Sequence, residues 1–466
     1  MSNTQEKPTG WACATIPEMI PRDGIFEDGD WIESKDQDQN GEVRLIQLAD
    51  IGDGNFRNRS SRFLTLKRAQ ELNCTYLQYN DILVARMPDP IGRACLFPYK
   101  NKNSFVTAVD VAIIRLGNNR VDPKYLLHAI NSPFIRQEIE KLQSGTTRKR
   151  ISRRNLAIIN FPLPPLPEQH RIVAKIEELF SSLDKGIESL KTAQQQLKIY
   201  RQAVLKWAFE GKLTNKNVKE GELPLGWKVR MISEVAKVNP SLPNKDNIDR
   251  NLEVQFLPMK LVEEIINKIH LTETRKFADA LKGSYTPFIN EDIVFAKVTP
   301  CMENGKIAIV DNLKNGIGFG SSEFHILRCS EQVLNKYLHR FIVQDKFRSE
   351  AQNAMTGAVG LRRVPKQFIE NYSIPIPPTI EEQQRIIAEI ESRLSVCDKI
   401  EESIEASLKQ AEALRQSILK KAFEGKLVPQ DPNDEPASKL LERIKSEREH
   451  QNSSKKCVVK KGYINE

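Results

Sequence analysis

The stretch PLPPLPEQHRIVAKIEELF, residues 162–180, places a proline-rich hinge directly before a helical pattern. The stretch IPIPPTIEEQQRIIAEIESRL, residues 374–394, repeats that arrangement later in the chain. Each proline favours an extended conformation in the residue before it, so both hinges are predicted to be stiff and non-helical. One chain therefore contains the same hinge and the same helix twice.

Both helices have start and stop signals. Pro167 suits the first helical position of one, and Thr379 with Glu382 forms a capping-box pattern at the start of the other. Gly211 and Gly425 are typical of the residue that follows the last turn of a helix. About 42 residues lie between these signals, which predicts a rod about 60 Å long at about 1.5 Å per residue.

Apolar residues recur along both helices with a period of seven, which is typical of a coiled-coil seam. The first helix contributes Ile172, Ile176, Leu179, Leu183, Leu190, Ala193, Leu197, Tyr200, Val204 and Trp207, and the second contributes Ile386, Ile390, Ile400, Ile404, Ala411, Leu414 and Ile418. Two equivalent helices separated by a whole block are expected to pair antiparallel about a local two-fold axis and to hold the two variable blocks at opposite ends of a ruler. The alternative is an ordinary helical hairpin within one core.

The repetition extends beyond the hinges. A shift of 214 residues brings RQAVLKWAFEGKL, residues 201–213, onto RQSILKKAFEGKL, residues 415–427, and about half of the positions are identical between 184–213 and 398–427. Such internal repetition predicts two half-molecules in tandem. We expect a first variable block at 1–161, its hinge and helix at 162–214, a second block at 215–374, its hinge and helix at 375–430, and a partly disordered tail at 431–466.

Each variable block has the pattern of an α+β fold. Residues 81–97 and 292–310 each read as a strand, a Pro/Gly loop carrying basic residues and a second strand, which indicates a hairpin. A helical pattern follows in both blocks. The fold class predicted is therefore α+β, with two domains in tandem and two long helices pairing as an antiparallel coiled coil.

The composition is compatible with a nucleic-acid partner. The 466 residues exceed one ordinary core, and 70 Lys and Arg against 61 Asp and Glu give a net charge of +9. The seven cysteines are scattered without a C-x-x-C pair, and the sequence shows neither a secretory signal nor a span for a membrane. We expect a cytoplasmic protein.

Catalytic and cofactor motifs are not evident. The NSPF sequence at 131–134 resembles the N-P-P-[FY] of amino-methyltransferases, but Ser132 replaces a proline and no glycine-rich loop precedes it. There is no G-x-x-x-x-G-K-[ST] for ATP, and the six histidines do not form an acid–base pair. Cys301 and Cys329 near His325 are interpreted as core residues, not as metal ligands. We expect no catalytic residue and no metal site in this chain.

Basic clusters occupy equivalent places before the two hinges. TTRKRISRR at 146–154 has its counterpart in GLRRVPK at 360–366, and cations with hydroxyls and glycine amides suit phosphate contacts. The alternative is a pair of solvated loops. The loops 86–93 and 297–306 are second candidates. The candidate DNA-binding residues are Arg86, Arg93, Thr146, Thr147, Arg148, Lys149, Arg150, Arg153, Arg154, Lys297, Thr299, Lys306, Arg362, Arg363 and Lys366.

The order of these features resembles the specificity subunit of type I restriction-modification enzymes. The resemblance covers residues 5–450 and rests on the P-[LI]-P-P hinges, the EQ at each helix start, and AFEGKL at each helix end. It implies that each variable block is a target recognition domain reading one half of a split double-stranded DNA sequence. The helices would form a spacer and a dock for two modification subunits.

The resemblance also implies where the chemistry lies. The modification subunits would bring S-adenosylmethionine and methylate adenine, and two restriction subunits would bring ATP- and Mg-dependent translocation and cleavage. Two alternatives remain open: a self-contained DNA methyltransferase, and a coiled-coil scaffold without DNA.

Overall fold

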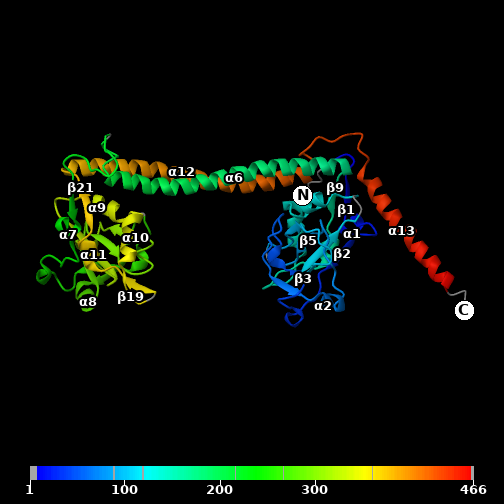
Figure 1. Ribbon diagram of the computed structural model, residues 1–466, viewed down its shortest axis with the longest axis horizontal. Coiled ribbons are helices and arrows are strands. Elements are labelled where there is room, and N and C mark those ends of the chain that lie inside the picture. Colours follow the sequence, from blue (N-terminus) through cyan, green and yellow to red (C-terminus); the bar gives the residue numbers. More distant parts are fainter. Residues whose placement is uncertain are drawn as a thin grey trace. The chain divides into compact units, whose positions relative to one another are not determined.

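The chain folds into two compact units, which are described separately. Unit 1 comprises Met1–Ser189 and Ser407–Glu466, and unit 2 comprises Leu190–Ala406. The computed structural model describes residues 8–87, 90–117, 120–215, 217–265, 267–358 and 360–462, with side chains to residue 449. Figure 1 labels the main elements of both units. In the part of the chain that the structure describes, no helix combines the length and apolar character that a membrane span needs.

The first variable domain lies in unit 1 and combines small sheets with short helices. Its strands are β1 (Ala12–Ala14), β2 (Ile25–Asp28), β3 (Val43–Ile46), β4 (Arg62–Leu64), β5 (Ile82–Ala85), β6 (Ala94–Leu96), β7 (Phe105–Thr107), β8 (Val111–Arg115) and β9 (Phe161–Leu163). Its helices are α1 (Ile16–Met19), α2 (Leu66–Glu71), α3 (Pro123–Ile130), α4 (Pro133–Leu142) and α5 (Arg153–Ala157).

The second variable domain lies in unit 2. Its strands are β10 (Lys228–Met231), β11 (Ala236–Val238), β12 (Glu253–Leu257), β13 (Glu273–Lys276), β14 (Thr286–Ile289), β15 (Ile293–Ala296), β16 (Ile307–Ile309), β17 (Ile317–Gly320), β18 (Phe324–Cys329), β19 (Thr356–Ala358), β20 (Leu361–Arg363) and β21 (Ser373–Ile376). Its helices are α7 (Ile232–Val235), α8 (Phe277–Lys282), α9 (Asn335–Ile342), α10 (Asp345–Asn353) and α11 (Lys366–Glu370).

The two domains have matching sheets, which confirms the predicted α+β duplication. The order β2-β8-β5-β6 in the first domain corresponds to β11-β18-β15-β16 in the second, and β4-β3-β7 corresponds to β13-β12-β17, where β14 adds one strand. The buried Asp81 accepts two hydrogen bonds from Arg115, at 2.8 and 2.7 Å, and the buried Asp292 accepts two from Arg328 at the same distances. The sheets and this ion pair are therefore conserved between the halves.

The glutamine of each hinge joins the domain to its helix. Gln169 Oε1 accepts from the Asp122 backbone N–H at 3.0 Å, and its Nε2 donates to the Pro164 carbonyl at 2.9 Å. Gln383 Oε1 accepts from the Leu334 N–H at 2.9 Å in the second half. Both glutamines are buried, so each side-chain amide satisfies backbone groups that would otherwise be unpaired. These contacts explain the repeated glutamine of the EQ.

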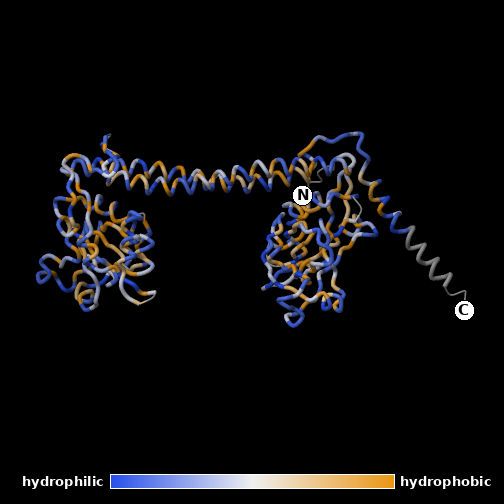
Figure 2. Tube along the Cα trace, in the orientation of Figure 1, coloured by the Kyte–Doolittle hydropathy of each residue, from blue (hydrophilic) through white to orange (hydrophobic). Residues whose placement is uncertain are grey.

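The long helices are α6 (Leu166–Phe209) and α12 (Ile380–Phe423), each crossing both units. Glu382 N–H donates to Thr379 Oγ1 at 3.2 Å, as half of a capping box would, but the Glu382 carboxylate accepts from Trp227 Nε1 at 3.2 Å instead of capping the helix. Gly211 and Gly425 have φ of +73° and +69°, which confirms the predicted helix ends. Hydrophobic and hydrophilic residues alternate along both helices (Figure 2).

Within unit 1 the first half of α6 pairs with the last half of α12, and within unit 2 the last half of α6 pairs with the first half of α12. Arg415 pairs with Asp184 in unit 1, and Arg201 lies 2.7 Å from Asp398 in unit 2. The residue numbers rise along one helix as they fall along the other, so the predicted antiparallel pairing is confirmed.

The buried seam keeps the period of seven but differs in detail from the prediction. The buried positions in the middle of α12 are Cys397, Ile404, Ala411 and Ile418, and α6 contributes Leu197 and Val204. Three predicted seam residues are wrong, because Tyr200, Ile400 and Leu414 are exposed. In α12 the row of Cys397, Ile404, Ala411 and Ile418 is buried, whereas Ile400 and Leu414 face solvent.

In the C-terminal tail, for which the sequence predicts partial disorder, the described residues include helix α13 (Ala437–Gly462). Ala437, Leu440 and Ile444 belong to the main hydrophobic core of unit 1. The Ala437 N–H donates to the Gly10 carbonyl at 2.9 Å. The start of α13 is therefore part of the first domain. Residues 463–466 lie outside the described residues.

Candidate nucleic-acid interface

The basic cluster before the first hinge forms an exposed hairpin. Ser144 and Arg150 exchange backbone hydrogen bonds of 2.8 and 2.9 Å, and Gly145 makes the turn possible with φ +94°. The five residues that follow Gly145 are all exposed: Thr146, Thr147, Arg148, Lys149 and Arg150. Within the described residues, their side chains form no hydrogen bond or ion pair. Three cations and two hydroxyls are thus available to an external anion.

The second domain has a hairpin at the matching place, formed by β19 and β20. Thr356 pairs with Arg363 and Gly357 has φ +125°; residue 359 lies outside the described residues. Arg363 donates two hydrogen bonds to Glu323, at 2.8 and 2.7 Å, which hold the pKa of that carboxyl below its ordinary value. Lys366 lies 2.9 Å from Glu370. This hairpin is therefore partly neutralised by its own domain.

The second candidate loops lie directly beside these hairpins. The Ile151 N–H donates to the Arg86 carbonyl at 3.1 Å, and the Val364 N–H donates to the Lys297 carbonyl at 2.8 Å. Thr299 Oγ1 donates to the Arg362 carbonyl at 3.1 Å. Sequence reasoning treated the loops and the clusters as separate candidates, whereas the structure brings them together in the same way in both domains.

Two arginines of the first domain share one carboxylate. Arg86 Nε lies 3.2 Å and Arg153 Nε lies 3.6 Å from the Asp28 carboxylate, and Arg153 also donates to the Phe26 carbonyl at 2.8 Å. Arg154 is exposed. Arg86 and Arg153 are therefore fixed at the base of the hairpin, while the positive charge at its tip is uncompensated.

Arg93 does not fit its prediction as a DNA contact. Its side chain is buried, and its guanidinium donates to the carbonyls of Ile51 at 2.8 Å and Leu48 at 2.9 Å. Burial and the charge of Arg57 lower the pKa of Arg93. We correct its role to that of a structural residue that joins the loops 48–51 and 86–93. Residues 88 and 89 of the second loop lie outside the described residues. Lys306, which precedes β16 as Arg93 precedes β6, is half-buried.

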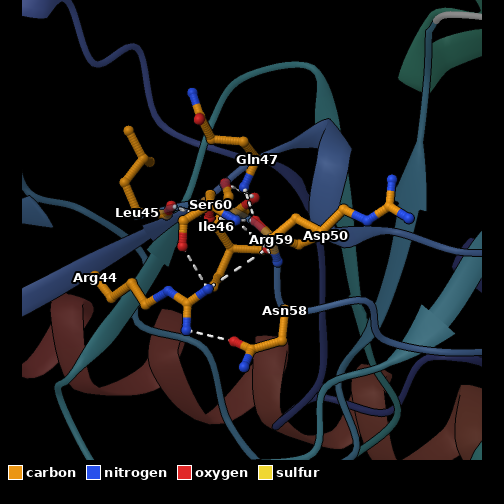
Figure 3. A network of polar contacts seen from close by, with 9 residues as sticks. Arg44, Leu45, Ile46, Gln47, Asp50, Asn58, Arg59 and Ser60 are labelled. Atoms are coloured by element: carbon orange, nitrogen blue, oxygen red, sulfur yellow. Dashed lines mark hydrogen bonds and ion pairs between the residues drawn. The ribbon is translucent and has the colours of Figure 1, made fainter. Parts of the chain in front are cut away.

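Sequence reasoning missed a further basic loop in the first domain. Residues 47–61 join β3 to β4 and contain Arg57 and Arg59, both exposed. The carboxylate of Asp50 organises the loop from within (Figure 3). The signal in the sequence was FRNRSSR at 56–62, which holds three arginines within seven residues.

A groove of similar size lies beside the end of one long helix in each unit. The groove of unit 1 has a volume of about 450 Å³ and is lined by Trp11, Phe134, Pro162, Lys420 and Phe423, among others. The groove of unit 2 has a volume of about 490 Å³ and is lined by Lys206, Phe209, Phe347, Tyr372 and Pro375, among others. Lys206 and Phe209 correspond to Lys420 and Phe423 through the shift of 214 residues. The groove is therefore duplicated with the fold.

The residues considered for other chemistry have structural partners. Ser132 caps α4, since its Oγ accepts from the Ile135 N–H at 3.4 Å, and Asn131 Nδ2 donates to the Ala94 carbonyl at 2.9 Å. Both ring nitrogens of His325 are occupied, by Asn239 at 3.0 Å and by the Val364 carbonyl at 2.9 Å. Among the described residues, no cluster of His, Cys, Asp or Glu could hold a metal ion.

Comparisons with known proteins agree with this geometry. Residues 9–198 and 224–410 match the family model described as the type I restriction modification DNA specificity domain. The chain is 38% identical over 272 residues to the EcoAI specificity subunit of Escherichia coli, and the match covers 49% of this chain and 45% of that protein. It is 26% identical over 343 residues to the StySPI specificity subunit of Salmonella potsdam, covering 70% and 72%. The chain thus spans about half the length of the EcoAI protein.

Solved structures share the fold. A chain from a study of complex assembly and conformational transition of the type I R-M system has a TM-score of 0.66 at 18% identity, covering 91% of this chain and 100% of that one. The HsdS subunit of Thermoanaerobacter tengcongensis has a TM-score of 0.57 at 19% identity, covering 91% and 99%. The fold and the two matched segments define a protein with two DNA specificity domains. The chain belongs to the type I restriction-modification DNA specificity family.

Proposed function

We propose that this chain is the DNA specificity subunit of a type I restriction-modification complex and has no catalytic site of its own. Each recognition domain binds one half of a split double-stranded target. The observation that carries this proposal is the duplicated interface, in which a basic hairpin adjoins a second basic loop in both domains. A coiled-coil scaffold without DNA would leave this repeated arrangement without a purpose.

The hairpins supply binding that does not depend on sequence. Arg148, Lys149 and Arg150 are exposed cations, and cations that neutralise phosphates release counterions and strengthen binding to any duplex. Gly145 has no side chain, so the backbone at this turn can approach the DNA phosphates closely. In the second domain Arg362 lies in the matching hairpin, and Lys297 takes the place of Arg86 in the adjoining loop. Sequence is then read from the base edges by neighbouring residues.

We further propose that two modification subunits bind the chain and that two restriction subunits complete the complex, in the cytoplasm. The duplicated grooves beside the helix ends support a pair of identical partners, because equivalent surfaces bind equivalent proteins. S-adenosylmethionine, ATP and Mg would be bound by those partners. The named relatives are subunits of type I restriction enzymes, which supports such an assembly.

A gel shift with the purified chain, alone and with a modification subunit, tests the proposal. We expect DNA binding that gains sequence specificity when the modification subunit is present, and no methyl transfer by the chain alone. Methylation by the isolated chain would favour a self-contained methyltransferase. Complex formation without any DNA binding would favour a scaffold.

A further inference from the structure

The loop between β3 and β4, residues 47–61, is fixed at both ends while its tip remains exposed. Phe56 packs edge-on against Phe97 and Tyr99, with ring centroids 6.0 and 5.8 Å apart, and its backbone forms a bridge with Ile51. Arg57 follows directly, and its N–H donates to the Asp50 carbonyl at 2.7 Å. The segment that leaves this aromatic cluster therefore has a defined direction.

The other end of the tip is held by the Asp50 carboxylate, which is completely buried. Its Oδ1 accepts from the backbone N–H groups of Arg59 at 2.6 Å and Ser60 at 2.8 Å, and its Oδ2 accepts from the Gln47 N–H at 2.8 Å and from the Ser60 hydroxyl. Arg44 Nη2 lies 3.5 Å away (Figure 3). Burial raises the pKa of Asp50, but these hydrogen bonds outweigh it and hold the pKa below its ordinary value. The carboxylate is therefore charged at neutral pH.

Between these two fixed points, the side chains of Arg57 and Arg59 have no hydrogen-bond or ion-pair partner among the residues that the structure describes. Both residues are exposed. In Figure 3 the Arg59 side chain points away from the Asp50 network. Asn58, between them, adopts φ +52° and accepts from Arg44 Nη1, which fixes the turn of the tip. Because the backbone is already ordered, binding through the two guanidinium groups costs side-chain entropy but little backbone entropy.

Hydrogen bonds join the loop to the neighbourhood of the proposed DNA-binding loops. The Gly54 N–H donates to the Ala94 carbonyl at 2.9 Å, and Arg136 donates to Asp53 at 2.9 Å. Arg93 joins the loop to residues 86–93, whose first residue contacts the basic hairpin. The loop, the second candidate loop and the hairpin are therefore consecutive neighbours.

The two halves share their sheets and hinge contacts but differ at this loop. The loop 258–272 between β12 and β13 has the same length of fifteen residues and the same place in the sheet. Its sequence contains no aspartate, and its exposed His270 lies 2.6 Å from Glu263. Elements that both domains share suit the phosphate backbone, which both half-sites have in common. Elements that differ suit the bases, in which the half-sites differ.

We propose that Arg57 and Arg59 read base edges in the half-site of the first domain, and that Asp50 is the positioning residue that fixes them. This inference rests on the proposed function. The fork of an arginine matches the O6 and N7 acceptors of guanine in the major groove, so this half-site contains guanine. The hairpin 144–150 holds the phosphates beside it.

Single-molecule mapping of methylated adenines, made by the chain assembled with its modification subunits, tests the proposal. Arg57→Ala and Arg59→Ala should relax the motif at one or two positions of one half-site, with a loss of discrimination of about 5- to 150-fold per position. The other half-site should be unchanged. Lys67→Ala, an exposed cation on α2 outside the loop, is the control and should leave the whole motif intact.

Asp50→Asn should relax the same positions as the arginine variants, because the loop loses the charge that gathers its amides. A thermal midpoint measured alongside separates this effect from simple destabilisation. An unchanged motif in both arginine variants overturns the proposal, and so does a uniform loss of affinity with a weaker salt dependence, which would mean phosphate contacts. A wild-type complex that methylates no split motif would instead refute the proposed function.

Discussion

Arg201 of α6 lies 2.7 Å from Asp398 of α12, and moving this pair by 214 residues converts it into the pair of Arg415 with Asp184. One ion pair is in unit 2 and the other in unit 1. The duplication of the sequence is thus also a symmetry of the helix contacts, since the two helices exchange places between the pairs. A local two-fold relation of this kind requires antiparallel helices.

We predict that Asp184→Lys places two cations together and lowers the thermal midpoint of unit 1 by about 2–4 °C, which corresponds to a loss of about 1 kcal/mol. Adding Arg415→Glu should regain most of this loss. Recovery should be incomplete, because the Arg415 guanidinium also lies 4.5 Å from the Phe180 ring centroid. The same exchange at Arg201 and Asp398 is the matched control in unit 2. Additive losses without recovery would contradict the pairing.

The hairpin 144–150 offers a prediction on affinity. Changing Arg148, Lys149 and Arg150 to alanine should weaken binding to all DNA sequences alike and lower the slope of log affinity against log salt by roughly one unit per lost contact. Binding titrations at several salt concentrations measure this slope. The control is Lys35→Ala, which removes another exposed cation of the same domain. An unchanged slope would show that the hairpin does not contact phosphates.

Substitution of Arg93 should lower the stability of the domain and not its affinity for DNA. Arg93→Met leaves the Ile51 and Leu48 carbonyls without their donor, so we expect a loss of about 2–4 kcal/mol in stability. Thermal unfolding measures this loss, and the hairpin variants should show almost none of it. A stable Arg93→Met protein with weakened DNA binding would restore Arg93 as a direct contact.

The sequence predicted the repeated features better than the individual contacts. The hinge, helix ends and antiparallel pairing follow from patterns within a few turns of chain, such as the glycines at 211 and 425. The position of Arg93 could not be predicted, because its burial depends on carbonyls at 48 and 51 that only the folded sheet brings near. Asp50 was missed for the same reason, since an aspartate between strands usually belongs to an exposed turn. The sequence did not predict that Cys397 lies in the seam, because the register between the two helices was unknown.

The continuous helices provide a prediction on the spacing of the half-sites. Inserting seven residues into both helices, after Gln196 and after Gln410, preserves the seam period and adds about 10 Å of helix. At about 3.4 Å per base pair, the gap in the methylated motif should grow by about three base pairs if the helices lie along the DNA axis. The insertion would also rotate one domain about the duplex by about a quarter turn relative to the other. If the protein does not tolerate this rotation, the alternative outcome is a loss of activity. An active protein with the original gap would show that the helices bind partners but do not set the distance.

The most direct test of the central claim, that each domain reads one half of a split target, is an exchange of residues 1–161. The block is replaced by the first domain of another specificity subunit, and methylated adenines are mapped by single-molecule sequencing of DNA treated with the assembled methyltransferase. The account predicts a split motif in which one half-site changes and the half-site of residues 215–374 stays the same. A change in both half-sites, or methylation of a continuous motif, would contradict it.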